Sequence, residues 1–163
     1  MNAGDAAEPD EVWLRPVTNE THLKRNTVHH GALKKWIAPP DDPAKPWKLE
    51  VSGRLRSLVD NISADAVQSV DAQKAKLMAS GKPVPSVLKY CGILYSQAND
   101  VRAIAEFDGD VIFDPTEDPA HANIVIKDKG LDEILTVTDT LIRKLVFLQA
   151  NQVSQNALFS SCA

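Results

Sequence analysis

The residues best suited to chemistry lie in the segment 113–124 (FDPTEDPAHANI), where two prolines bracket a short turn. Asp114 stands at the end of one expected strand, and His121 begins the next. If these strands pair, the carboxylate and the imidazole meet across the turn, and such an Asp–His pair orients the ring and raises its basicity. The pattern is typical of a His-dependent hydrolase or nuclease, with His121 as the general base and Asp114 as its partner.

The sequence does not mark a nucleophile for this site. A GxSxG motif is absent, and Cys91 lies in the middle of an expected strand beside Gly92. The alternative to catalysis is a hairpin turn in which His121 forms hydrogen bonds with loop carbonyls. We favour this structural alternative on the sequence alone.

The other histidines, His22, His29 and His30, lie in the N-terminal part of the chain. In the enzyme interpretation, His29 or His30 lines a pocket together with His121. Neighbouring residues point apart on a strand and do not share a helix face, so His29 and His30 are a poor chelating pair. Because no HExxH-like spacing occurs either, the sequence predicts neither a metal nor a cofactor.

A second candidate surface combines basic and aromatic residues around a proline-rich loop at residues 38–46. Lys34, Lys35 and Trp36 precede the loop and Trp47 follows it. Proline fixes φ and removes a backbone donor, so we expect an irregular arm here. Tryptophan is enriched at interface hot spots, and these four residues are therefore predicted to bind a protein partner. Packing of the tryptophans onto the body of the domain is the alternative, and for the rings themselves we favour it.

The C-terminal third carries a resemblance to other proteins. Asp114-Pro115, Pro119-Ala120-His121-Ala122 and Ile124, followed by a final helical segment, resemble a stretch found in small bacterial proteins of uncharacterised function. The resemblance implies a bacterial origin and an α+β fold, and it implies no activity.

The elements that must position these residues follow from hydrophobic periodicity. Short apolar runs predict strands over 12–17, 87–95, 110–114 and 121–127. Apolar residues spaced three and four apart predict two amphipathic helices, over 54–79 and 131–150. We therefore predict an α+β fold, with a small and mostly antiparallel sheet covered by these two helices. One domain is expected over 12–150, with a disordered tail over 1–11 and a second tail over 151–163.

Composition limits the class of protein. The chain of 163 residues has a formal net charge of −4, two cysteines and an acidic N-terminus without an apolar leader. These features predict a soluble cytoplasmic domain without a disulfide framework and without a membrane partner. A small basic group that includes Lys24 and Arg25 makes nucleic-acid binding possible, but the acidic balance disfavours it. The favoured function is a non-catalytic accessory domain of a bacterial multi-gene system, which binds a protein partner through its N-terminal arm.

Overall fold

An antiparallel sheet in the order β7-β8-β5-β1-β6-β9 organises the chain in a computed structural model, and β4 pairs with β5 outside this path. The structure describes residues 1–25, 27–29, 31–34, 37–38, 44, 46–104 and 108–160. The strands of the sheet are β1 (Val12–Asn19), β4 (Ile37–Ala38), β5 (Trp47–Leu55), β6 (Leu88–Gln97), β7 (Asp110–Phe113), β8 (His121–Lys129) and β9 (Val146–Gln149). A separate ribbon joins β2 (Leu23–Lys24) to β3 (Thr27–Val28).

Helices connect and cover these strands. They are α1 (Gly31–Lys34), α2 (Ile62–Ala79), α3 (Ala98–Arg102), α4 (Leu131–Lys144) and α5 (Ala150–Val153), with 3₁₀ turns at Glu20–His22 and Arg56–Leu58. The predicted α+β class is confirmed, and the four predicted strands correspond to β1, β6, β7 and β8. None of the helices in the described ranges is long and apolar enough to span a membrane.

The prediction of a helix from residue 54 is wrong, because a strand occupies the preceding segment. In β5, Leu49, Val51, Gly53 and Leu55 are buried, and the residues that alternate with them, Glu50, Ser52 and Arg54, are half-buried. This period of two is the pattern of a strand. The helix α2 begins only at Ile62, where the side chain of Asn61 accepts a hydrogen bond from Ala64 N (3.0 Å) and caps the first turn.

The second predicted helix also has different limits. The helix α4 ends at Lys144, and residues 146–149 form β9, which pairs with β6. The apolar spacing continues past residue 144, but Val146 and Phe147 favour strand geometry and the backbone there completes the edge of the sheet. Within α4, Leu135 is 38% exposed, whereas Val137 is fully buried.

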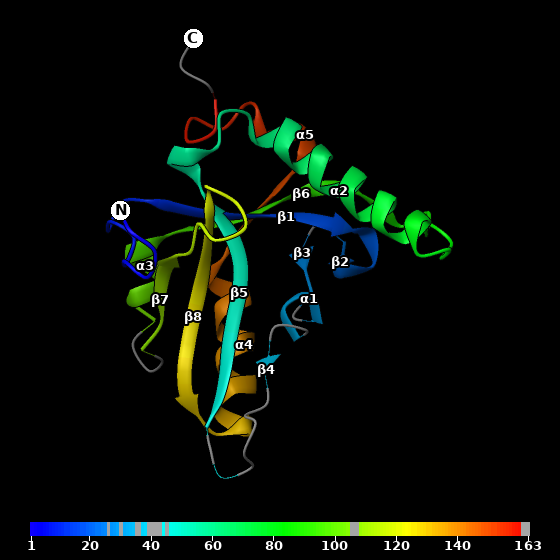
Figure 1. Ribbon diagram of the computed structural model, residues 1–163. Coiled ribbons are helices and arrows are strands. Elements are labelled where there is room, and N and C mark those ends of the chain that lie inside the picture. The colour runs from blue at the N-terminus through cyan, green and yellow to red at the C-terminus, as the bar shows by residue number, and fades with distance from the viewer. Residues whose placement is uncertain are drawn as a thin grey trace.

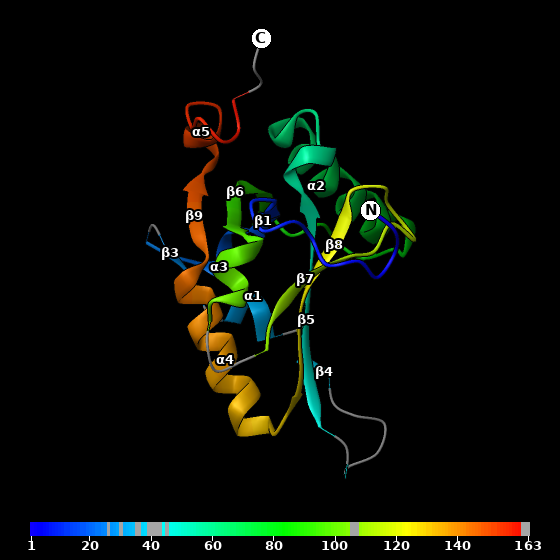
Figure 2. The same cartoon turned by 90° about the vertical axis from the view of Figure 1, so that its left-hand side faces the viewer.

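The main helices pack on different faces of the sheet. Figure 1 shows α4 behind β5 and β8, and α2 beside β1 and β6. A larger core lies between α4 and the long strands, and a smaller one joins β1 and β6 to α2 and α5. The stripe that α2 buries is narrow, consisting of Ile62, Ala66 and Val70. In both views, the lower part of the face of β5 and β8 that points away from α4 carries no described helix (Figure 2).

The two terminal segments pack on the sheet where the structure describes them. Gly4 N donates to Phe113 O (2.8 Å) and Ala7 N donates to Val111 O (2.8 Å), so the N-terminus lies along the outer edge of β7. At the other end, Val153 and Phe159 are buried in the smaller core. The predicted domain limits stay a prediction. Most of the predicted proline-rich arm, including residues 39–43, lies outside the described residues.

Candidate functional site

Strand register brings one set of polar side chains onto the face of the sheet opposite α4, close to the start of α2. Arg54 of β5 lies opposite His121 of β8, and Ser52 lies opposite Asn123. Alternate residues of a strand point to opposite faces, and Val51 and Gly53 belong to the side of the core. The side chains of Ser52, Arg54, His121 and Asn123 therefore share the face turned away from α4.

His121 forms a hydrogen-bonded chain with Ser52 and Asp114. Its Nε2 lies 2.9 Å from Ser52 Oγ, and its Nδ1 lies 2.8 Å from the carbonyl oxygen of Asp114. A carbonyl oxygen only accepts hydrogen bonds, so Nδ1 carries the proton in the neutral ring. Nε2 is then the acceptor for the Ser52 hydroxyl. This is the tautomer that a general base acting on Ser52 requires.

The carboxylate of Asp114 supports the same ring. One of its oxygens lies 3.7 Å from His121 Nδ1, and the other accepts a hydrogen bond from Thr116 Oγ1 (2.5 Å). The Thr116 hydroxyl is the largest cause that lowers the pKa of Asp114 below its ordinary value. Asp114 is thus ionised at neutral pH and faces the imidazole with a negative charge. The carboxylate and the imidazole therefore lie close to each other across the turn, although the hydrogen bond of the ring is to the Asp114 backbone carbonyl and not to its carboxylate.

Arg54 connects this site to α2 and to the turn. Its guanidinium donates to Asp65 Oδ1 (2.6 Å) on α2 and to Asp118 Oδ2 (2.5 Å) in the turn before β8. Burial raises the pKa of Asp65, and Arg54 opposes that shift. The second oxygen of Asp65 is buried and has no hydrogen-bond partner among the described residues. Two carboxylates therefore share one guanidinium, which leaves this part of the site with a negative charge.

Ser52 was not identified from the sequence. Its hydroxyl makes the contact with His121 Nε2 (2.9 Å) that no sequence motif marked. The alternation within residues 47–55 was the available signal, since it would have placed Ser52 and Arg54 on the polar side of a strand. Pairing of that strand with residues 121–129 is a long-range property that no local motif marks. The backbone of Ser52 is also held, because half-buried Arg15 donates to its carbonyl oxygen (2.5 Å).

The other predicted catalytic residues lie elsewhere or outside the described chain. His29 N donates to His22 O (2.7 Å), which places His29 beside the β2–β3 ribbon rather than at the Ser52–His121 pair. The prediction that His29 or His30 lines a pocket with His121 stays a prediction, and this contact of His29 does not support it. His30 lies outside the described residues. Across the part of the chain that the structure describes, no group of three or more His, Cys, Asp or Glu side chains could hold a metal ion.

The predicted partner-binding residues are only partly described. Trp47 is half-buried and packs against the larger core. Lys35 and Trp36 lie outside the described residues, as does the side chain of Lys34. Trp13 is fully buried, and its indole Nε1 donates to Ala122 O (3.2 Å). Packing is therefore confirmed for Trp13, and partner binding by the other four residues stays a prediction.

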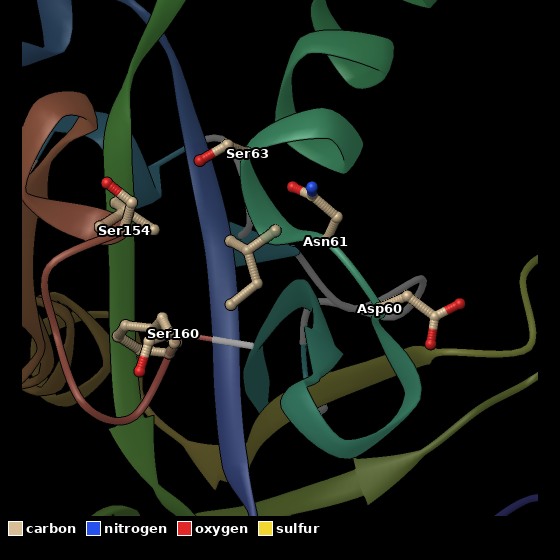
Figure 3. Close-up of a pocket in the computed structure, with 8 residues that line it drawn as sticks. Asp60, Asn61, Ser63, Ser154 and Ser160 are labelled. Carbon is tan, nitrogen blue, oxygen red and sulfur yellow. The ribbon is translucent and has the colours of Figure 1, made fainter. Parts of the chain in front are cut away.

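Two pockets provide further places for small molecules. One has a volume of about 260 Å³ and lies between the start of α2 and the C-terminal segment. Figure 3 shows Ser154 and Ser160 on one side of it, and Asp60 and Asn61 on the other. Its lining contains no histidine or cysteine, and Asp60 is its ionisable side chain.

The second pocket, of about 340 Å³, lies beside β9 and contains Cys91. Burial raises the pKa of the Cys91 thiol, which lowers the fraction of reactive thiolate at neutral pH. Cys91 is therefore a weaker candidate nucleophile than Ser52, whose hydroxyl already contacts a base.

Comparison with known proteins identifies no relative. No protein family model matches the chain, and neither a curated protein nor a solved structure matches it. The chemistry of the Ser52–His121–Asp114 site must therefore be judged from its own geometry.

Proposed function

We propose that the chain is a hydrolase that uses Ser52 as nucleophile and His121 as general base. The observation that supports this proposal is the 2.9 Å contact between Ser52 Oγ and His121 Nε2, with the opposite ring nitrogen held at 2.8 Å by Asp114 O. A serine becomes a useful nucleophile when an adjacent base takes its proton and a third group orients that base. All three parts are present on β5, β8 and the turn between β7 and β8.

The reaction proceeds in two balanced steps. His121 Nε2 takes the proton of Ser52 as Oγ bonds to the substrate carbonyl carbon, and the bond to the leaving group breaks as His121 returns that proton to it. Water then attacks the acyl carbon and gives one proton to His121. The bond between that carbon and Ser52 Oγ breaks, His121 returns the proton to Oγ, and the carboxylic acid product leaves. Asp114 stays ionised throughout and stabilises the imidazolium that forms in each step.

The charges around the site favour an uncharged or cationic acyl substrate over a nucleic acid. Asp114 and Asp118 are both partly exposed, and Asp118 already uses Arg54. A phosphodiester would bring a further negative charge close to these two carboxylates. The ion pairs that the described residues form place no additional lysine or arginine beside them to balance that charge. The hydrolase form of the His121 prediction is therefore better supported than the nuclease form.

Labelling with a fluorophosphonate probe tests the proposal directly, because the probe reacts with a serine activated by a neighbouring base. The expected result is one adduct, mapped by mass spectrometry to the peptide that contains Ser52. Ser52→Ala and His121→Ala should abolish the adduct while circular dichroism shows an intact fold. Ser80→Ala, which changes an exposed serine at the end of α2, is the control and should label normally. Labelling that survives in Ser52→Ala would contradict the assignment.

The accessory protein-interaction role remains a second proposal, in the cytoplasm of a bacterial multi-gene system. It is favoured by the way the arm is anchored: Ile37 pairs with Leu49 and Ala38 with Lys48, so both ends of the intervening loop are fixed at β5. A photo-crosslinking residue at position 36 should then give one discrete adduct that Lys35→Glu removes. The same residue at position 67, exposed on α2, is the control, and an identical pattern there would contradict a specific arm interface.

A further inference from the structure

Asp118 holds the turn that carries the base. Its Oδ1 accepts a hydrogen bond from Ala120 N (2.8 Å), and its carbonyl oxygen accepts one from His121 N (3.0 Å). In addition, Asp114 N donates to His121 O (3.0 Å) across the turn. The position of the Asp114 carbonyl relative to the His121 ring therefore depends on the conformation that Asp118 imposes.

Arg54 is the group that fixes Asp118 from outside the turn. It lies directly opposite His121 in the strand register, and its two terminal nitrogens reach Asp118 and Asp65 separately. The helix α2 carries Asp65 and packs on the sheet through Ile62, Ala66 and Val70. A rigid helix and a short turn are thus joined through one planar guanidinium, beside the hydrogen bond between Ser52 and His121.

We infer that Arg54 is a positioning residue, which keeps the Asp114 carbonyl on His121 Nδ1 and so keeps Nε2 available to Ser52. The consequence for catalysis rests on the proposed hydrolase function, whereas the effect on the ring does not. Without the contact from Arg54, Asp118 loses its tie to α2, and the turn can move away from the ring. The imidazole then populates the other tautomer, in which Nε2 carries the proton and cannot accept one from Ser52.

Lysine cannot replace Arg54 in this role. The guanidinium presents a fixed fork of donors that contacts two carboxylates at once, whereas an ammonium group is a single point charge on a flexible chain. Arg54→Lys therefore keeps the positive charge and removes the geometry. Asp118→Asn is the complementary variant, because its side-chain oxygen can still accept from Ala120 N while the ionic contact with Arg54 is lost.

The test measures the His121 tautomer by ¹⁵N NMR of the imidazole together with the rate of fluorophosphonate labelling. In the unchanged protein, Nδ1 should carry the proton. Arg54→Lys and Asp118→Asn should both increase the Nε2-protonated form and slow labelling between about tenfold and a hundredfold, the scale expected for a small misplacement of a catalytic group. Arg102→Lys is the matched control, since Arg102 joins Asp110 to the Ala7 carbonyl on the same sheet, away from His121. It should leave the tautomer and the labelling rate unchanged.

The outcomes separate this inference from the proposed function. If the tautomer shifts in both variants but the unchanged protein never labels, Arg54 positions the ring and the hydrolase proposal fails. If Ser52 labels in the unchanged protein and both variants keep its rate and tautomer, the hydrolase proposal stands and the role of Arg54 is overturned. Should Arg54→Lys fail to fold, Asp118→Asn alone decides, because it leaves the guanidinium on Asp65 in place.

Discussion

Gly53 of β5 lies against the indole ring of Trp13 on β1. A Cβ atom at position 53 would be 2.3 Å from both Cε2 and Nε1 of that ring, closer than non-bonded atoms can approach. The ring is fully buried, and its Nε1 donates to Ala122 O (3.2 Å) on β8. One side chain thus connects three neighbouring strands, and it can do so only because residue 53 has no side chain. The same strands carry Ser52 and His121.

Gly53→Ala should therefore destabilise the protein. The added methyl group has no free space, so either the indole moves or the strands separate, and overpacking of this kind costs about 1–3 kcal/mol or more. Chemical denaturation measures the loss in the free energy of unfolding. The control is Gly130→Ala, where the nearest atom to the new Cβ is Glu133 Oε1 at 3.6 Å, and its expected cost is about 1 kcal/mol or less. Equal costs for the two variants would show that Trp13 is not closely packed on Gly53.

Two leucines of α4 give a matched test of how this helix docks. Leu141 is fully buried, whereas Leu135 is 38% exposed. Leu141→Ala should cost about 2–5 kcal/mol and lower the melting temperature by about 5–20 °C, while Leu135→Ala should change stability by about 1 kcal/mol or less. Thermal melts of the two variants decide the matter. Similar small shifts in both would mean that α4 is not packed on the larger core.

Local patterns predicted the elements that stand between clear turn residues or that carry one sustained helical stripe. The strands β1, β6, β7 and β8 and the body of α4 belong to this group. The strand β5 was missed because Leu55 lies near a following run of apolar residues, and helical spacing was extended backwards across it. The strand β9 was missed because the apolar spacing of α4 continues through Leu145, which is buried although it lies beyond the end of the helix. At β9, pairing with β6 overrode the local helical spacing, whereas at β5 the alternation of buried residues agreed with the observed strand pairing.

The site shows the same division. Asp114 and His121 lie seven positions apart on either side of a proline-bracketed turn, so local chain geometry alone predicts that they meet. Ser52 lies 69 positions from His121, and only the register of β5 against β8 brings the two together. The fit of Arg54 between Asp65 and Asp118 depends in addition on where α2 begins. Contacts made by three separate elements could not be read from one sequence.

The close approach of β9 to β6 makes Gly92 a second sensitive position. Gly92 has a φ of +155°, and a Cβ atom there would be 2.0 Å from the carbonyl oxygen of Leu148. Gly92→Ala should therefore push β9 off the edge of the sheet while leaving the pairing of β5 with β8 intact. Hydrogen–deuterium exchange should become faster in residues 146–153 and stay slow in 121–129. Unchanged protection of 146–153 would contradict the tight contact between the two strands.

The hydrogen bond from Thr116 to Asp114 should make part of the stability depend on pH. It lowers the pKa of Asp114 in the folded protein below the unfolded value of about 3.8. A carboxyl group whose pKa is lowered by folding contributes stability above the unfolded pKa and loses it as the pH falls through the folded pKa. Thr116→Val should thus be less stable than the unchanged protein at pH 6. The difference should shrink below about pH 4 and vanish once the pH is also below the lowered pKa of Asp114 in the unchanged protein.

Two measurements check this dependence on Thr116. The first is chemical denaturation of both proteins between about pH 2.5 and about pH 6, which gives the difference in their unfolding free energies. These pH values lie on both sides of the ordinary pKa of aspartate. NMR titration of the Asp114 carboxyl carbon should show its pKa rising towards the ordinary value in Thr116→Val. Thr136→Val is the control, since Thr136 Oγ1 donates to the Asp132 carbonyl on α4 and not to a carboxylate. The prediction is contradicted if the loss of unfolding free energy in Thr116→Val does not change with pH, as is expected for the control. The Thr116 hydroxyl would then not hold the Asp114 carboxylate beside His121.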